Sequence, residues 1–364
     1  MNNGPDAEVD DNSRAGYDHP MTTHDLSRYA RQIIFPGLGE AGQRRLLGAS
    51  VTLIGCGATG AVIANHLVRS GVGRLRIVDR DFIELNNLQR QLLFDEQDMA
   101  AGLPKAEAAR RKLSRINSQV TVEGIVADVT ADNILELLAG ADLAMDGADN
   151  FETRFLLNDA CIHLGLPWIY CGVIASYGVT MTIRPGETAC LRCLLGQMPA
   201  PGVAPTCDTA GVLAPSVAVV ASIAAGEALK LLAGFGELNS GGLLNFDLLD
   251  NSLERFEVLR RPDCPACGRR ELEFLRAETG TRSATLCGRN AVQISVHGRP
   301  AVNLAELAER LRQSGIPQVT VNPYLLRAAI DGLELTLFPD ARAIIKGTED
   351  ETVARTFYAR YVGM

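Results

Sequence analysis

The sequence predicts an α/β protein with a Rossmann-like, open and mostly parallel sheet, followed by a small α+β appendage. A glycine-rich loop, residues 55–60, separates a short apolar strand from a helix. An acidic residue, Asp79, ends the next strand at the spacing expected of a nucleotide-binding βαβ unit. Strand and helix patterns then alternate to about residue 171, which is typical of parallel sheets with helical connections.

The elements are expected in a regular order along the chain. Two helical patches over 27–47 surround a turn at Pro36-Gly37, and a Pro- and Gly-rich crossover, predicted to be mobile, covers 198–211. In the main sheet we expect strands at 51–54, 75–78, 120–125, 143–146, 168–171, 177–183, 243–246 and 253–259. Helices are expected at 61–70, 105–116, 133–138, 153–164 and 215–233. In the appendage, strands are expected at 292–296, 319–321, 333–338 and 343–345, and helices at 304–313 and 352–361.

Composition restricts the class of protein. The chain has 364 residues, of which 47% are hydrophobic, so about two domains with a sizeable core are expected. The net charge of −8 provides no basic surface for nucleic acid. Nine cysteines, four of them in CxxC pairs, favour metal binding and free thiols in a reducing cytoplasm. The longest apolar run, 212–225, contains Pro215 and predicts a buried helix, so no membrane span is expected.

Three segments differ in character. Residues 1–26 are polar and lack the apolar stretch of a signal peptide, so a disordered tail is predicted. Residues 27–270 carry the nucleotide and cysteine motifs. After a polar linker, residues 284–364 form the small α+β domain, for which the sequence indicates no role.

The glycine loop and Asp79 are the candidate nucleotide site. Gly55, Gly57 and Gly60 allow backbone N–H groups to approach phosphates at a helix start. Asp79 can accept hydrogen bonds from both ribose hydroxyls. The alternative for the loop is a tight turn that packs the helix onto the strand and binds no ligand. The alternative for Asp79 is that it caps a helix or turn.

Positive and amide side chains after Asp79 favour a triphosphate. The stretch 86–91 includes Asn87 and Arg90, and Lys105 begins the next helix. A dehydrogenase that binds a pyrophosphate at a helix start needs no such cations. A solvated side chain is the alternative for Lys105.

A further strand ends on Asp146, and Asp149 follows it. Carboxylates suit Mg²⁺, which takes oxygen ligands together with substrate phosphates. The alternative is that Asp149 caps the following helix.

Two CxxC pairs, Cys190/Cys193 and Cys264/Cys267, can close a tetrahedral Zn²⁺ site. The intervening segment is far longer than in short zinc ribbons, so four ordinary buried thiols are the alternative.

These motifs in this order resemble the MoeB/ThiF family, adenylyltransferases that activate sulfur-carrier proteins and are related to ubiquitin-activating enzymes. The resemblance covers about 27–268 and includes two further stretches, 28–32 and 207–211. It implies that ATP and Mg²⁺ are bound by Asp79, Arg90, Lys105 and Asp149, and that the four cysteines hold structural Zn²⁺. It also implies a homodimer in which Arg31 reaches the phosphates of the partner subunit's site.

The reaction implied is adenylylation of the C-terminal Gly-Gly carboxylate of a ubiquitin-like sulfur-carrier protein, with release of pyrophosphate and later sulfur transfer. Such a carboxylate, with a pKa of about 3.5, is already ionised at neutral pH and needs no general base. In part of the family the cysteine matching Cys207 takes part in sulfur transfer, and a sulfur donor protein is then a further partner. Cys207 is alternatively the site of a ubiquitin-like thioester, or an incidental exposed thiol.

Other functions fit less well. An NAD-dependent oxidoreductase would leave the cations at Arg90 and Lys105 unexplained, and a non-catalytic binding module would not need an intact set of site residues. Some relatives carry a rhodanese domain after the core, but here only Cys287 is available and the surrounding loop pattern is absent. The sequence does not distinguish thiamin, molybdopterin and tRNA-thiolation pathways.

Overall fold

The structure is a computed structural model of the chain. It describes residues 26–199, 210–276, 282–286, 290–295 and 301–362. Residues 1–25 of the predicted tail, Cys207 and Cys287 lie outside these ranges, and Leu26, the last residue assigned to the tail, begins the first helix.

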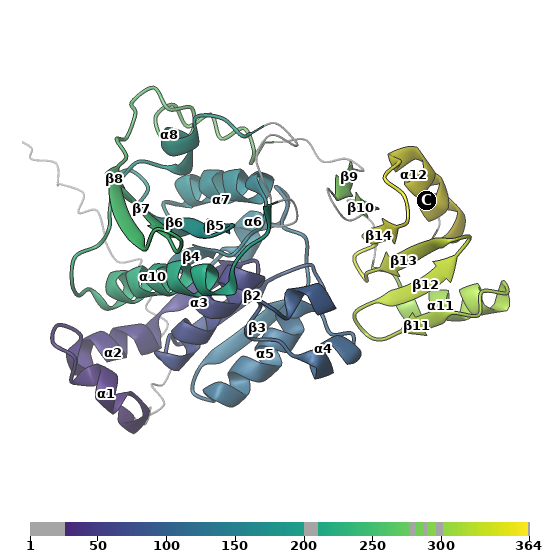
Figure 1. Cartoon of the computed structure of the whole chain (residues 1–364), viewed down its shortest axis with the longest axis horizontal. Helices are drawn as coiled ribbons and strands as arrows, with labels where there is room; N and C mark the ends of the chain where they lie inside the picture. Colours follow the sequence, from purple (N-terminus) through teal and green to yellow (C-terminus); the bar gives the residue numbers. More distant parts are fainter. Residues whose placement is uncertain (1–25, 200–209, 277–281, 287–289, 296–300, 363–364) are drawn as a thin grey trace, which may run out of the picture.

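An eight-stranded sheet forms the centre of the main body, in the order β3-β2-β1-β4-β5-β6-β7-β8 (Figure 1). Its first five members in this order are parallel, as predicted: β3 Thr121–Ile125, β2 Arg74–Val78, β1 Ser50–Ile54, β4 Leu143–Asp146 and β5 Trp168–Ile174. The remaining strands are antiparallel: β6 Tyr177–Ile183, β7 Gly242–Asp247 and β8 Ser252–Glu257. The sheet therefore has a Rossmann-like half and an antiparallel half.

Helices cover both faces of this sheet. Two hydrophobic clusters form, one beneath α3, α5 and α10 and one beneath α6 and α7, because alternate residues of each strand point to opposite faces. The N-terminal helices η1, α1 and α2 follow the predicted patches around Pro36. The bounds are η1 Leu26–Tyr29, α1 Ala30–Ile33, α2 Gly39–Gly48, α3 Ala58–Arg69, η2 Leu85–Asn87, α4 Glu96–Ala100, α5 Lys105–Ile116, α6 Ile134–Leu137, α7 Phe151–Leu164, α8 Leu191–Leu195 and α10 Ala214–Ala233.

Helix α10 confirms the helix predicted over 215–233 and begins one residue earlier. Pro215 occupies its first turn, where a missing N–H costs nothing, and Gly234 ends it in the left-handed conformation. Among the described residues it is the one helix long and apolar enough to cross a membrane, but half of that stretch is buried inside the protein. It packs against α3, β5 and β6, as expected of a core helix.

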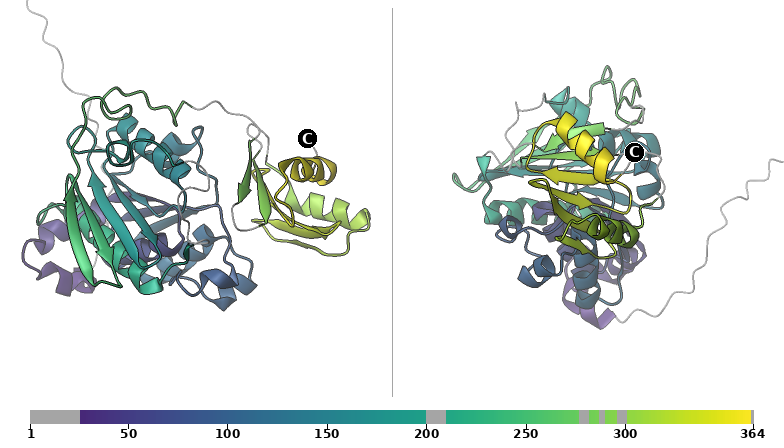
Figure 2. Two further views of the ribbon diagram at one scale, coloured as in Figure 1. Left: turned by 45° about the horizontal axis from the view of Figure 1, so that its top comes forward. Right: turned by 90° about the vertical axis from the view of Figure 1, so that its right-hand side faces the viewer.

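The C-terminal domain is a six-stranded antiparallel sheet with two helices (Figure 2). The strand order is β11-β12-β13-β14-β10-β9. Two strands, β9 and β12, were not predicted. The bounds are β9 Arg282–Leu286, β10 Ala291–Ser295, β11 Val319–Val321, β12 Leu326–Ile330, β13 Leu333–Leu337, β14 Ala343–Lys346, α11 Leu304–Gln313 and α12 Glu351–Tyr361. The helices and the inner strand residues enclose a separate hydrophobic core.

Candidate active site

The glycine loop joins β1 to α3, and close backbone packing requires two of its glycines. Gly55 has a φ of +89°, and a Cβ there would lie 2.4 Å from the carbonyl oxygen of Gly147. A Cβ on Gly60 would lie 2.1 Å from the carbonyl oxygen of Gly55. Gly57, the N-cap of α3, faces open space, since the nearest atom to a Cβ there is Nε2 of Gln91 at 3.9 Å. The start of α3 is therefore accessible to an anion, which its N–H groups and dipole favour.

Asp79 lies directly after β2 and faces this loop. Its Oδ2 accepts a hydrogen bond of 2.6 Å from the backbone N–H of Cys56, and Oδ1 accepts one of 2.7 Å from that of Asp81. Burial raises the pKa of Asp79, while the charge of Lys105 and these hydrogen bonds oppose the shift. Each oxygen keeps a lone pair, so the carboxylate can still accept hydrogen bonds from ribose hydroxyls.

Lys105 begins α5 and is buried, with 5% of its surface exposed. Its Nζ lies 3.2 Å from Oδ2 of Asp81, and its backbone N–H donates a hydrogen bond to the carbonyl oxygen of Asp81. The alternative of a solvated lysine is therefore wrong. Lys105 brings a fixed positive charge to the edge of the sheet where Asp79 lies.

The segment after Asp79 is held in a turn by Asn87. Asn87 is buried, and its Oδ1 accepts a hydrogen bond from the backbone N–H of Glu84, whose side chain caps η2 in return. Arg90 donates from Nη1 to the carbonyl oxygen of Asn86 at 2.7 Å. Among the described residues no carboxylate forms an ion pair with Arg90, so its charge is available to an anionic ligand.

Asp149 follows β4 with an exposed side chain. The neighbouring Asn150 caps α7, because its Oδ1 accepts a hydrogen bond of 2.8 Å from the backbone N–H of Thr153. Asn150 also donates from Nδ2 to Oδ1 of Asp149 at 3.1 Å. The capping role considered for Asp149 thus belongs to Asn150, and Asp149 presents carboxylate oxygens of the kind that Mg²⁺ binds.

Three charged residues that the sequence analysis did not single out complete this edge: Arg80, Asp81 and Asp128. Arg80 donates from Nη1 to Oδ1 of Asp128 at 2.8 Å. Burial lowers the pKa of Arg80, but the charges of Asp128, Asp81 and Asp149 raise it by more, so the guanidinium stays charged. Arg80 therefore connects the end of β2 electrostatically with Asp149. Arg80 and Asp81 follow β2, and Asp128 follows β3. This position after a strand was the sequence signal that could have identified all three residues.

The structure of one chain leaves Arg31 apart from these groups. It lies on α1, which packs beside α2, and its side chain is exposed (Figure 1). No hydrogen bond or ion pair joins it to another residue in the described part of the chain. A role at an ATP site would therefore require a second subunit.

The four CxxC cysteines converge at the antiparallel end of the main body, around α8. Their Sγ atoms all lie within 4.8 Å of one another, with 3.7 Å between Cys190 and Cys264 and 3.4 Å between Cys193 and Cys267. Four sulfurs at about 2.3 Å from a tetrahedral Zn²⁺ are about 3.8 Å apart, so the spacing fits this ion. The backbone N–H of Arg261 donates to the Sγ of Cys193, which favours the thiolate that a metal needs.

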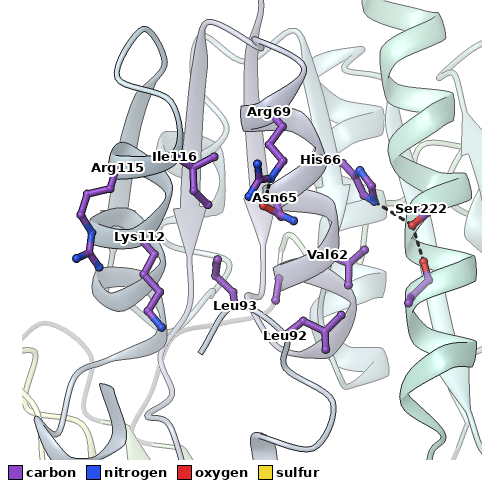
Figure 3. A pocket seen from close by; sticks show the side chains of 12 residues that line it. Val62, Asn65, His66, Arg69, Leu92, Leu93, Lys112, Arg115, Ile116 and Ser222 are labelled. Atoms are coloured by element: carbon purple, nitrogen blue, oxygen red, sulfur yellow. Dashed lines mark hydrogen bonds between the residues drawn. The ribbon is translucent and has the colours of Figure 1, made fainter. Parts of the chain in front are cut away.

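A hollow lies away from these groups, between α3, α5 and α10 (Figure 3). It has a volume of about 530 Å³, and Arg69, Lys112 and Leu92 are among its lining residues. His66 and Ser222 join α3 to α10 across it, with 3.0 Å between Nε2 and Oγ. Burial lowers the pKa of His66, and Arg69 adds to this shift, so the imidazole is neutral at pH 7 and its role here is structural.

Comparison with known proteins identifies this arrangement. The sequence profile of the ThiF family matches residues 29–266. The chain belongs to the ThiF family. The predicted resemblance to the MoeB/ThiF adenylyltransferases is confirmed, and the protein is an adenylyltransferase.

Two relatives define the extent of the similarity. The sulfur carrier protein ThiS adenylyltransferase of Bacillus subtilis is 46% identical over 340 residues, which cover 92% of this chain and 99% of that protein. The sulfur carrier protein adenylyltransferase of Thermus thermophilus is 42% identical over 270 residues, covering 72% of this chain and 99% of that protein. The second match is too short to include both the main body and the C-terminal domain.

Solved structures of E. coli MccB share the fold. The complex with MccA-N7isoASN has a TM-score of 0.60 and 25% identity, and covers 67% of this chain and 75% of that one. The structure with ATP has a TM-score of 0.54 and 27% identity, with coverages of 63% and 68%.

Proposed function

We propose that this protein uses ATP and Mg²⁺ to adenylylate the C-terminal carboxylate of a ubiquitin-like sulfur-carrier protein. The convergence of the glycine loop, Asp79, Lys105 and Asp149 at the carboxyl edge of β1, β2 and β4 carries the proposal. Ligands of open α/β sheets bind at this edge. We assign the activity to residues 27–270, the segment that holds every one of these groups.

Each group has a task that suits its position. The N–H groups of the glycine loop receive phosphate oxygens, and Asp79 binds the ribose. Arg90 and Lys105 stabilise negative charge on the triphosphate. Asp149 would hold Mg²⁺, which neutralises charge on the phosphates when bound.

The reaction then follows from positioning and charge. The ionised C-terminal carboxylate of the carrier attacks the α-phosphorus, a new P–O bond forms, and the bond to the bridging oxygen breaks. Pyrophosphate leaves with that electron pair, and the acyl-adenylate remains. No proton moves, so no general base is required. The tasks of the site are to hold two anions together and to stabilise the leaving group.

A protein substrate also needs a surface, and the outer hairpin β7–β8 offers one. Leu249 in its turn and Leu253 and Phe256 on β8 are all at least half exposed. The β7–β8 turn lies at the same edge of the sheet as the nucleotide groups, because β7 ends where β5 ends. We place the carrier on this hairpin, from which its C-terminal Gly-Gly can extend toward Asp149.

Cys207 is the proposed acceptor after adenylation. The described chain resumes three residues later in the sequence, at residue 210, and the carbonyl oxygen of Gly211 accepts a hydrogen bond from the N–H of Ala175 just after β5, at the carboxyl edge. We expect Cys207→Ala to keep carrier-dependent ATP–pyrophosphate exchange and to lose any covalent carrier adduct seen by mass spectrometry. An adduct stable to mild reductant is a thioester, and one that reductant cleaves is an acyl disulfide. Full sulfur transfer by Cys207→Ala would make this cysteine a bystander.

A homodimer accounts for the isolation of Arg31. Large apolar side chains are exposed near it in sequence, Ile34 and Phe35, which directly follow α1. Their burial against a second copy would place Arg31 at an interface, where it can reach the partner's site.

The carrier itself provides the decisive test. Carrier proteins captured from the host are sequenced at their C-termini and assayed for ATP–pyrophosphate exchange. We expect exchange with a C-terminal Gly-Gly carrier and loss of exchange when its last glycine is deleted or replaced by alanine. Exchange with no carrier, or with any free carboxylate, would contradict the proposed substrate.

A further inference from the structure

The segment from Asp79 to Glu84 contacts the nucleotide site on one side and the C-terminal domain on the other. The carboxylates of Asp79 and Asp81 bind the glycine loop and Lys105. Side chains alternate along an extended segment, and Phe82 and Glu84 point the other way, into the C-terminal domain.

Phe82 and Glu84 both join this segment directly to the C-terminal domain. The ring centre of Phe82 lies 5.2 Å from that of Phe338. The guanidinium of Arg327 lies over the ring of Phe82, 5.5 Å from its centre. The Nζ of Lys346 donates to Oε1 of Glu84 at 2.7 Å. Glu84 is also the cap of η2, so this ion pair touches the residue that begins the turn leading to Arg90.

Arg342 makes the most constrained contact. It lies between β13 and β14 with 2% of its surface exposed, and its guanidinium stacks 3.5 Å from the ring centre of Phe338. Its Nη2 donates to the carbonyl oxygen of Arg80 at 2.8 Å. Nε lies 3.8 Å from a carboxylate oxygen of Asp340, and neither Nε nor Nη1 makes a hydrogen bond to a described residue. A buried guanidinium is costly, and its one hydrogen bond fixes the residue between Asp79 and Asp81.

A second connection reaches Arg80 from the same domain. Asp128, which accepts from Nη1 of Arg80 through Oδ1, accepts through Oδ2 from Nε2 of Gln293 on β10 at 3.0 Å. Arg80 is therefore held at its backbone by Arg342 and at its side chain through Asp128.

We propose that the C-terminal domain holds the 79–84 segment in the geometry that binds ATP, with Arg342 as a positioning residue that acts through Arg80. This inference rests on the ATP site of the proposed function. Coupling of this kind is reciprocal, so ATP binding also tightens the contact between the domains. The main body is thereby made dependent on a domain that supplies no group to the reacting phosphates.

The test compares Arg342→Met, which removes the hydrogen bond and keeps most of the volume, with Arg355→Met on the exposed face of α12. ATP affinity is measured by calorimetry on the full-length protein without carrier, and exchange kinetics are measured with carrier. We expect Arg342→Met to weaken ATP binding about tenfold, raising the KM for ATP with little change in kcat or in the KM for carrier. Arg355→Met should match the wild type.

Hydrogen exchange distinguishes coupling from a general loss of stability. In the wild type, ATP should slow exchange in the backbone of 333–346, and this slowing should disappear in Arg342→Met. If that variant does not fold, Lys346→Gln, which removes a partly exposed contact, must show a smaller loss of the same protection. Unchanged ATP affinity in folded Arg342→Met, or an absence of ATP-dependent protection in the wild type, would overturn the inference. A wild type that binds ATP without carrier-dependent exchange would contradict the proposed function alone, since the binding measurements still decide the inference.

Discussion

The parallel and antiparallel halves of the main sheet differ in whether their polar groups are already paired within the protein. In the parallel half, charged side chains are already paired within the protein, as Lys105 is with Asp81 and Arg80 with Asp128. In the antiparallel half, four cysteine sulfurs lie within 4.8 Å of one another, and as thiolates they would repel each other without a cation between them. The parallel half carries the groups that we propose bind a ligand that enters and leaves, whereas the sulfurs of the antiparallel half have the spacing needed to hold an ion.

The largest expected effect concerns the parallel half and activity. Asp149→Asn should reduce carrier-dependent ATP–pyrophosphate exchange at least about 100-fold while thermal stability is unchanged, because a neutral amide binds Mg²⁺ poorly and Asn150 supplies the cap. Asp132→Asn, another exposed carboxylate near the same edge, is the matched control. Near-normal exchange in Asp149→Asn would rule out the metal role.

Mixing two inactive variants tests whether this half is complete within one subunit. Arg31→Ala and Asp149→Ala should each be inactive alone. After subunit exchange the mixture should regain about a quarter of wild-type exchange activity, since half of the dimers are mixed and each has one complete site. If activity does not return although exchange is demonstrated by native mass spectrometry, Arg31 does not act across the interface.

In the antiparallel half, we expect mutation of a cluster cysteine to lower the stability of the protein. Cys264→Ser should lose the metal and lower the free energy of unfolding by on the order of 4 kcal/mol, since loss of a structural metal is among the largest single-residue effects. Elemental analysis should find about one zinc per chain in the wild type and none in the variant. Cys161→Ala, at a buried cysteine of α7 outside the cluster, should keep its zinc. Wild-type protein that is metal-free and equally stable would contradict the structural role.

The smallest effect is a pH dependence near the zinc cluster. Burial raises the pKa of Asp159 to about 6, although its Oδ2 accepts a hydrogen bond from the N–H of Phe274. The folded state therefore binds this proton more tightly than the unfolded state, and stability falls as pH rises toward and through this pKa. Relative to Asp159→Asn, the wild type should lose about 2 kcal/mol between about pH 4 and about pH 7 in zinc-saturated urea denaturation. A difference independent of pH would show that Asp159 is not protonated in the fold.

The parallel half was the more predictable one. Its strands follow apolar runs, and α5 begins at Lys105 and ends at Ile116 as expected. Asp79 and Asp149 were selected as candidates because each lies just after a predicted strand, and the glycine loop because it joins a strand to a helix. Local capping was less predictable, because Asp149 and Asn150 are both good caps and only the three-dimensional turn shows that Asn150 serves.

Contacts between distant segments could not be predicted from the sequence. Phe82 reads as an ordinary apolar residue after a strand, and its partner Phe338 lies in another domain. The strand β12 was missed because two of its five residues are alanines, which are depleted in strands, and β9 because it is polar and lies at a sheet edge. Both depend on pairing with neighbours rather than on local preference.

The site residues of the two halves occupy different parts of the sequence, so they emerge from the ribosome at different times. Every residue assigned to the ATP site within one chain lies between Gly55 and Asp149, so the ribosome completes this set early. The cluster of four cysteines cannot form until Cys267 has emerged, since its two CxxC pairs lie at the ends of a long stretch of chain that must meet. Arg342 comes later still. During synthesis the glycine loop therefore emerges before the four cysteines are complete and before the C-terminal domain, so translation sets the order in which these parts can fold.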